Sequence, residues 1–189
     1  IPGLFKHLTD IVPKMTAMGY YNVAMISVIR KQSLPYLVDI AKKAMEWNAS
    51  ITFSSYTQLR TNSNAHSITS EEDLELLRKQ IGELIEMRRD GAPIINSEPV
   101  FKNMITFFET NSIPNCKTGY RHHVVNPDGS FVPCAMHKVY FKTHKELVEN
   151  FTKKNTCTAC YVPLRANTEL SIGDLWNGFG WPYIKQRFS

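Results

Sequence analysis

The sequence lacks an apolar run long enough to cross a bilayer. Its longest, from Tyr20 to Ile29, falls well short of the about 20 residues that a membrane-spanning helix needs. No secretory leader with basic, apolar and small-residue parts opens the chain, and no low-complexity or collagen-like repeat occurs. With 43% hydrophobic and 21% charged residues, the composition is that of a globular protein. We therefore expect a cytoplasmic protein that has no membrane partner.

Cysteine is scarce. The four cysteines among 189 residues are Cys116, Cys134, Cys157 and Cys160. In a reducing compartment such residues hold metal more often than they form disulfides. Because all four lie in the later part of the chain, the sequence predicts two regions with different roles.

Basic residues outnumber acidic ones, 22 to 17, for a net charge of +5. This charge would permit an anionic partner. The densest basic pairs, however, are scattered and have no interleaved aromatic residues: Arg30-Lys31, Lys42-Lys43, Arg88-Arg89 and Lys153-Lys154. We interpret them as solvated surface rather than a nucleic-acid interface.

The first region alternates between helical and strand patterns. Helical spacing of apolar residues runs from Gly3 to Met18, and Tyr21–Ile29 has the pattern of a buried strand. A second helix is expected from Ser33 to Trp47, followed by a strand over Ser50–Tyr56. A strand, a helix and a strand in this order predict a βαβ unit with parallel strands.

A polar loop, residues 57–68, follows the second strand. Ligands bind at the carboxyl ends of parallel strands, so this loop is a candidate binding element. A capping box from Thr69 to Glu72 predicts a helix that Asp90-Gly91 ends, and a shorter helix starts at Ser97. We place a domain boundary after residue 112, between domains 1–112 and 113–189.

The later region contains a predicted β-hairpin. Asn126-Pro127-Asp128-Gly129 lies between β-branched runs, which is a strong turn signal. Folding about Pro127-Asp128 sets Asn126 opposite Gly129 and Arg121 opposite Cys134, unless a bulge shifts the register by one residue. Cys134 then returns to the base of the hairpin, where it can meet Cys116.

Cys157 and Cys160 have the minimal spacing for two thiolates of one turn to bind the same metal centre. All four thiolates can therefore converge. Structural zinc and an iron–sulfur cluster both accept four cysteines, and disulfides are the remaining alternative. Spacing alone favours zinc.

The larger pattern reverses that order. Cys116-x-x-Gly119, the hairpin that ends in Pro133-Cys134, and Cys157-x-x-Cys160 together resemble the auxiliary-cluster domain of radical S-adenosylmethionine (SAM) enzymes. The two strands and the helix between them, within residues 21–56, resemble the later half of that superfamily's partial (β/α) barrel. The implied fold class is α/β, the C-terminal portion of such a barrel followed by a small hairpin-containing domain.

The resemblance implies an enzyme that uses a 5′-deoxyadenosyl radical to abstract hydrogen from a small-molecule or peptide substrate. The four cysteines would ligate an auxiliary [4Fe-4S] cluster, as in the one-cluster (twitch) version of the SPASM domain. That cluster would transfer electrons or order the substrate site. An electron donor such as flavodoxin or ferredoxin is the implied protein partner.

The chain departs from the family because it has no Cys-x-x-x-Cys-x-x-Cys motif. In the family this motif holds a second [4Fe-4S] cluster, the one that cleaves SAM. This chain alone should therefore be inactive, and we expect the motif upstream of Ile1.

Strand ends in the family contribute to the nucleoside pocket. Here the resemblance implies Ser27, Ile29, Ser54 and Tyr56, although each could equally be barrel core.

Other polar residues near the cysteines have alternative interpretations. His122, His123 and His137 are ligands, proton carriers or, more simply, neighbours of the site. Lys117 and Arg121 could offset a cluster's charge.

In the tail, Arg165 is expected to be exposed or to contact substrate. The tail aromatics are expected to pack over the barrel; they are Trp176, Phe179, Trp181 and Tyr183.

Two alternative functions remain besides that of an enzyme. One is a zinc-stabilised Cys₄ binding module that meets an acidic partner or nucleic acid. The other is a scaffold in which the metal only staples a small region.

Overall fold

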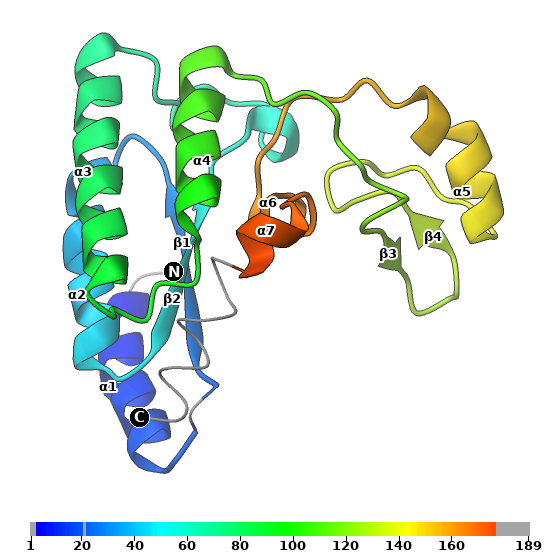
Figure 1. Ribbon diagram of the computed structural model, residues 1–189. Helices are drawn as coiled ribbons and strands as arrows, with labels where there is room; N and C mark the ends of the chain where they lie inside the picture. The colour runs from blue at the N-terminus through cyan, green and yellow to red at the C-terminus, as the bar shows by residue number, and fades with distance from the viewer. Residues whose placement is uncertain (1–2, 21, 177–189) are drawn as a thin grey trace.

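The computed structural model describes residues 3–20 and 22–176. The elements are α1 (Leu4–Ala17), β1 (Ala24–Ile29), η1 (Leu34–Tyr36), α2 (Leu37–Glu46), β2 (Ser50–Ser55), η2 (Gln58–Arg60), α3 (Glu71–Arg89), α4 (Glu98–Thr110), β3 (Val124–Val125), β4 (Phe131–Val132), α5 (His144–Asn150), η3 (Thr152–Lys154), α6 (Pro163–Thr168) and α7 (Ile172–Leu175). Figure 1 shows two lobes, one formed by α1–α4 with β1 and β2 and the other by the β3–β4 hairpin with α5. The short helices α6 and α7 lie between them.

The predicted βαβ unit is confirmed. β1 and β2 pair in parallel, with Ala24 opposite Ser50 and Ile29 opposite Ser55, and the chain between them passes through η1 and α2. The helix expected from Ser33 begins as a 3₁₀ turn that contains Pro35, at a position near the start of a helix where proline is tolerated. Tyr21 lies outside the described residues, and the regular strand starts at Ala24.

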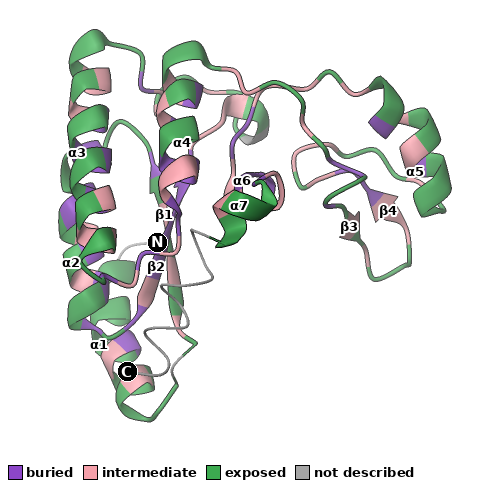
Figure 2. Cartoon of the chain, in the orientation of Figure 1, coloured by how far each residue is buried: buried purple, intermediate pink, exposed green. Residues whose placement is uncertain are grey.

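The main core lies between one face of this sheet and the helices. Ile29, Ile51 and Phe53 are fully buried there with residues of α2, α3 and α4. Purple, buried residues run along β2 and recur in patches on these helices (Figure 2). Tyr161, Ala166 and Leu170 belong to the same core, so the segment after the last cysteine packs with the first lobe.

β1 differs from the buried strand that the sequence predicts. Exposed and covered residues alternate along it, and the side chains of Ile26 and Val28 are 70% and 43% exposed. Within the described residues, helices cover only the face of β1 that carries Met25 and Ile29. The prediction of a strand is confirmed, whereas that of full burial is wrong.

The edge of β2 that faces away from β1 is closed by residues 93–96. The backbone of Ile51 bonds Pro93 and Ile95 at 2.9 and 2.8 Å. The buried side chain of Asn96 then accepts from Phe53 N at 2.6 Å and donates to Phe53 O at 3.0 Å. The Asn96 amide thus takes the place of a peptide group in a third strand.

Two predicted helices are present with small differences. The cap of α3 is Ser70, whose hydroxyl accepts from Asp73 N at 3.1 Å, so the cap lies one residue after the expected Thr69. α4 starts after Ser97 and buries Val100 and Met104 as expected.

No helix in residues 3–20 or 22–176 combines the length and the apolar character that crossing a membrane requires. Trp176 at the end of α7 is 64% exposed, which differs from the expected packing. Phe179, Trp181 and Tyr183 lie outside the described residues.

Candidate metal centre

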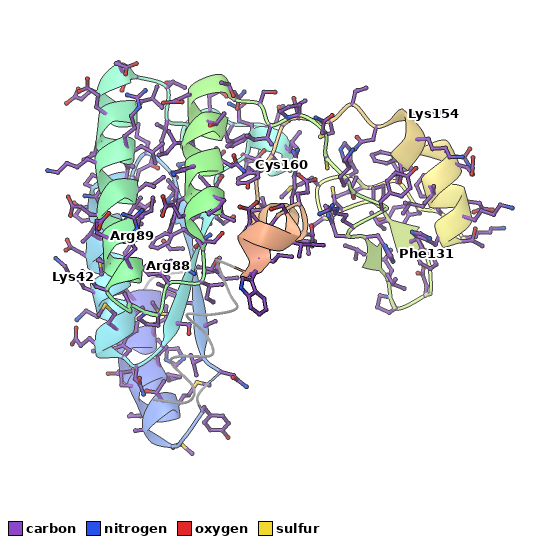
Figure 3. All side chains as sticks on the ribbon, viewed as in Figure 1. Lys42, Arg88, Arg89, Phe131, Lys154 and Cys160 are labelled. Atoms are coloured by element: carbon purple, nitrogen blue, oxygen red, sulfur yellow. The ribbon has the colours of Figure 1, made fainter. Side chains whose placement is uncertain are left out.

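All four cysteines line one cavity of about 70 Å³. They come from three segments: Cys116 follows α4, Cys134 follows β4, and Cys157 and Cys160 precede α6. None of them forms a disulfide. The structure thus brings together the four residues that the sequence predicts as ligands. In Figure 3 Cys160 lies between the two lobes.

The hairpin forms, in a register one residue from the predicted one. Val124 pairs with Val132 and Val125 with Phe131, which leaves Pro127, Asp128 and Gly129 as a three-residue loop. Gly129 has a φ of +81°, as in a three-residue hairpin loop that ends in a bulge. Asp128 stabilises the loop by accepting from the backbone and the hydroxyl of Ser130.

A tight turn after Cys116 brings that residue to the hairpin. Gly119 N donates to His122 O at 2.7 Å, and the Thr118 hydroxyl donates to Pro133 O. Gly119 has a φ of +86°, and a β-carbon there would lie 1.8 Å from Thr152 Oγ1. Only glycine fits this turn, because both the backbone angle and the close contact exclude a side chain.

The Cys157-x-x-Cys160 turn is joined to Cys116 by Asn155. Its side chain donates to Cys116 O at 3.1 Å and accepts from Cys157 N at 3.0 Å. Thr158 O accepts from Ile113 N at 2.9 Å in the same region. Sequence reasoning missed Asn155, although an asparagine two residues before a turn residue is a known signal for such a bond.

Arg165 is buried, with 1% of its surface exposed, so the expectation of an exposed residue is wrong. It lines the cysteine cavity and binds carbonyls from two chain segments: Cys160 O at 2.7 Å, Ile113 O at 2.8 Å and Pro114 O at 2.9 Å. Its Nε donates to Glu169 at 2.9 Å. The charge is buried because these acceptors and the carboxylate compensate it.

Burial sets the electrostatics of the thiols. It raises the pKa of Cys160 to about 11 and also raises the pKa of Cys116. The positive charge of Arg165 opposes the rise at both. A thiol with a raised pKa holds its proton more firmly, so a cation must displace protons from Cys116 and Cys160 to bind there.

Two of the three candidate histidines line the cavity, namely His122 and His137. His122 Nδ1 lies 3.0 Å from the Thr168 hydroxyl, which itself donates to Leu164 O at 2.8 Å. Because that hydroxyl has a single proton, it accepts from His122, and Nδ1 is the protonated nitrogen. Burial lowers the pKa of His122, which favours the neutral ring.

The other two imidazoles are arranged differently. His137 Nε2 is buried without a hydrogen-bond partner in the described structure, and the ring meets Phe151 edge-on at 5.2 Å. His123 lies instead in a ring cluster with Phe131 and His144.

Lys117 and Arg121 are not among the described residues that line the cysteine cavity. The Lys117 backbone donates to Glu169, and the Arg121 guanidinium binds Thr168 O and Leu170 O at the end of α6.

The residues expected at a nucleoside pocket are not gathered on one face of the sheet. Ser27 and Ile29 share the face that carries Met25, and Ile29 is fully buried in the core. Ser54 pairs with Val28 on the opposite face. Tyr56 follows the strand, and its hydroxyl donates to Ser63 O at 2.8 Å.

The polar loop after β2 touches the cysteine turn. The Thr57 hydroxyl donates to Ala159 O at 2.8 Å, and Leu59 lines the cysteine cavity. Tyr56, Thr57 and Gln58 also line a second cavity of about 240 Å³ against the end of α4. The carboxyl end of β2 is therefore adjacent to the candidate metal centre.

The basic pairs do not gather into one surface. Figure 3 shows Lys42, Arg88 and Arg89 on the helical lobe and Lys154 on the hairpin lobe. Arg89 pairs with Glu86 and Glu98, so part of this charge is compensated.

Among the described residues, no group of three cysteine, histidine or acidic side chains lies in a geometry that would hold one metal ion. The donor set nevertheless fits a thiolate-bound metal group, because four unpaired thiols surround one cavity. Comparison of the chain with family models, with curated proteins and with solved structures found no match.

Proposed function

We propose that the four cysteines hold a [4Fe-4S] cluster in a radical SAM enzyme. The observation that carries the proposal is their convergence: Cys116, Cys134, Cys157 and Cys160 come from three segments, yet line one cavity without forming disulfides. Four soft thiolate ligands are the usual set for such a cluster.

The cavity has room for a group of several atoms. It measures about 70 Å³, several times the space of about 10–15 Å³ that one water molecule needs. Other side chains line it together with the four cysteines, so this volume is compatible with a cluster, and metal analysis distinguishes a cluster from zinc.

The first lobe supports the rest of the proposal. Its parallel βαβ unit precedes the cysteine region in the order that a partial (β/α) barrel and its auxiliary domain would have. We assign residues 1–112 to the barrel and 113–189 to the auxiliary domain, in which the segment after Cys160 packs against the barrel core. Ser27, Ile29, Ser54 and Tyr56 remain our candidates for the nucleoside pocket.

The bond from Thr57 to Ala159 supports a role for the cluster near the substrate. Substrates of parallel α/β folds bind at the carboxyl ends of strands, and this bond joins that end of β2 to the cysteine turn. When bound, the cluster would supply a carrier for one electron. The chain's own residues hold the cysteine turn beside the substrate side of the sheet.

The proposed enzyme would need cofactors and an electron donor in addition to these residues. SAM and a second [4Fe-4S] cluster would start the radical, and flavodoxin or ferredoxin would provide the electron. The substrate would be a small molecule or a peptide. The protein would act in the cytoplasm, without a membrane or nucleic-acid partner.

Metal analysis tests the proposal directly. The chain is prepared without oxygen, incubated with iron and sulfide, and assayed for iron, sulfide and zinc. We expect about four iron and four sulfide per chain with broad visible absorbance, and a large loss of both in each Cys→Ser variant. Thr158→Ala, which changes the same turn without removing a thiol, should retain them. A colourless protein with one zinc per chain would instead establish the zinc-stabilised module.

A further inference from the structure

We propose that Arg165 is the positioning residue of the metal centre and that the Arg165–Glu169 pair sets the charge beside it. The inference rests on the proposed function and adds to it the group that fixes the cysteine segments relative to one another. Neither residue is a ligand. Both residues position the chain segments that carry the cysteines, and both place a charge next to these segments.

The hydrogen bonds of Arg165 connect the two ends of the cysteine region. One terminal nitrogen donates to Cys160 O at 2.7 Å, and the other donates to Ile113 O and Pro114 O at 2.8 and 2.9 Å. The first carbonyl belongs to the last cysteine, and the other two lie just before Cys116. A planar guanidinium with donors in a fixed fork can hold three carbonyls at once, whereas a lysine ammonium cannot hold them in this geometry.

Glu169 completes the connection. One of its oxygens accepts from Arg165 Nε at 2.9 Å, and the other accepts from Lys117 N at 2.7 Å. The pair therefore forms hydrogen bonds with the backbone on both sides of Cys116, at Pro114 and at Lys117. The Arg165 side chain is 1% exposed and that of Glu169 is 14% exposed, so solvent screens the pair little.

Burial makes a purely stabilising role a poor explanation. The desolvation of a buried ion pair roughly offsets its attraction, so such pairs contribute little net stability compared with apolar residues. The pair instead fixes the relative position of two chain segments, because the Arg165 donors bind carbonyls at Ile113 and Pro114 in one segment and at Cys160 in the other. It also provides a positive charge in the wall of the cavity that Cys116 and Cys160 line.

The first test needs no metal. Amide hydrogen exchange is measured on the metal-free chain of residues 1–189, for residues 113–118 and 157–161. Arg165→Met should speed exchange in both segments by about tenfold or more. The lost hydrogen bonds would raise the equilibrium constant for local opening of these segments by about that factor. Arg121→Met is the matched control, because it removes an arginine that binds the end of α6 instead, and it should leave these two segments unchanged.

The second test separates positioning from charge in the iron-loaded chain. Arg165→Lys keeps the charge but not the fork, so we expect less iron per chain and an unchanged midpoint potential in the fraction that loads. Glu169→Gln keeps an oxygen for Lys117 N and removes a negative charge, so the potential should rise. Arg165→Met should lower it. A merely structural role would not move the potential in opposite directions.

The outcomes are distinct. Wild-type exchange together with wild-type iron content and potential in Arg165→Met would overturn the inference. If Arg165→Met does not fold, Arg165→Lys and Glu169→Gln decide, and wild-type behaviour of both would overturn it equally. If the unaltered chain binds zinc instead of a cluster, the proposed function fails, while the exchange experiment still tests the positioning of the two segments.

Discussion

The hydroxyl of Thr57 and the carbonyl of Ala159 form a 2.8 Å hydrogen bond across 102 positions of sequence. Thr57 is the first residue of the loop that leaves the β2 end, and Ala159 lies between the last two cysteines. The same loop contributes Leu59 to the cysteine cavity. The position of the cysteine turn therefore depends on the end of the sheet.

Thr57→Val should loosen the cysteine turn. The replacement has a similar shape but leaves Ala159 O without its donor, so we expect about 1 kcal/mol less stability. Urea denaturation measures the loss, and hydrogen exchange of residues 157–160 should become faster. Thr61→Val is a control in the same loop, because its hydroxyl meets Tyr56. Equal exchange in the two variants would contradict this role of Thr57.

Gly119→Ala should destabilise the hairpin lobe far more than Gly129→Ala. Both glycines have positive φ, but a β-carbon at Gly119 would meet Thr152 and Leu147 at 1.8 and 2.6 Å, whereas one at Gly129 would meet nothing within 4 Å. Backbone strain alone costs about 1 kcal/mol, and forced repacking adds about 1–3 kcal/mol.

Thermal or urea unfolding of the two glycine variants gives the comparison. A loss in Gly119→Ala no larger than that in Gly129→Ala would mean that Thr152 moves aside without cost. Because Gly119 lies three residues after Cys116, iron content should fall together with stability.

Asn96→Leu should destabilise the first lobe by about 2–4 kcal/mol, because a buried backbone donor and acceptor of Phe53 would lose their partners. Both bonds are to the Asn96 side chain. Asn103→Leu serves as control: it removes one bond, from the amide to the Tyr161 hydroxyl, and should cost about 1 kcal/mol. A similar loss in both variants would argue against the strand-like role of Asn96.

The metal-free chain should lose stability as pH rises from about 9 to about 11. Burial raises the pKa of Cys160 from 9.0 to about 11, so in this window the unfolded thiol is ionised while the folded one retains its proton. The stability present below pH 9 is then lost, by about 2 kcal/mol.

Serine does not titrate in this range, so Cys160→Ser isolates the effect. The free energy of unfolding should fall less steeply with pH in Cys160→Ser than in the unaltered chain, both kept reduced and with a chelator present. Equal pH slopes would show that the thiol of Cys160 is not desolvated in the folded chain.

Local patterns were sufficient to predict most elements of the first lobe. Apolar spacing places α1, α2 and α3, and the strand patterns around α2 predict the parallel pair that forms. The cysteine spacing and the hairpin turn predict which thiols converge. The helix and strand patterns depend on contacts between neighbours in the sequence, and the hairpin depends on one tight turn, whereas the meeting of the three cysteine segments also needs long-range bonds such as that from Asn155 to Cys116 O.

What could not be predicted depends on segments far apart in the chain. Arg165 and Glu169 are four residues apart on one helix, a visible pair, but their burial results from carbonyls near residue 113 and from Cys160. The hairpin register differs from expectation because Gly129 adopts a positive φ and adds one residue to the loop. The exposure of Ile26 depends on what lies against the sheet, which no strand pattern specifies.

The two edges of the β1–β2 sheet differ in their capacity to accept another strand. On the β2 side, residues 93–96 and the Asn96 amide occupy the backbone groups. On the β1 side, no bridge to a further strand occurs within the described residues, and Ile26 and Val28 are exposed beside that edge. Among residues 3–20 and 22–176, this sheet therefore has one open edge, that of β1, and a further strand that pairs with the sheet would add there.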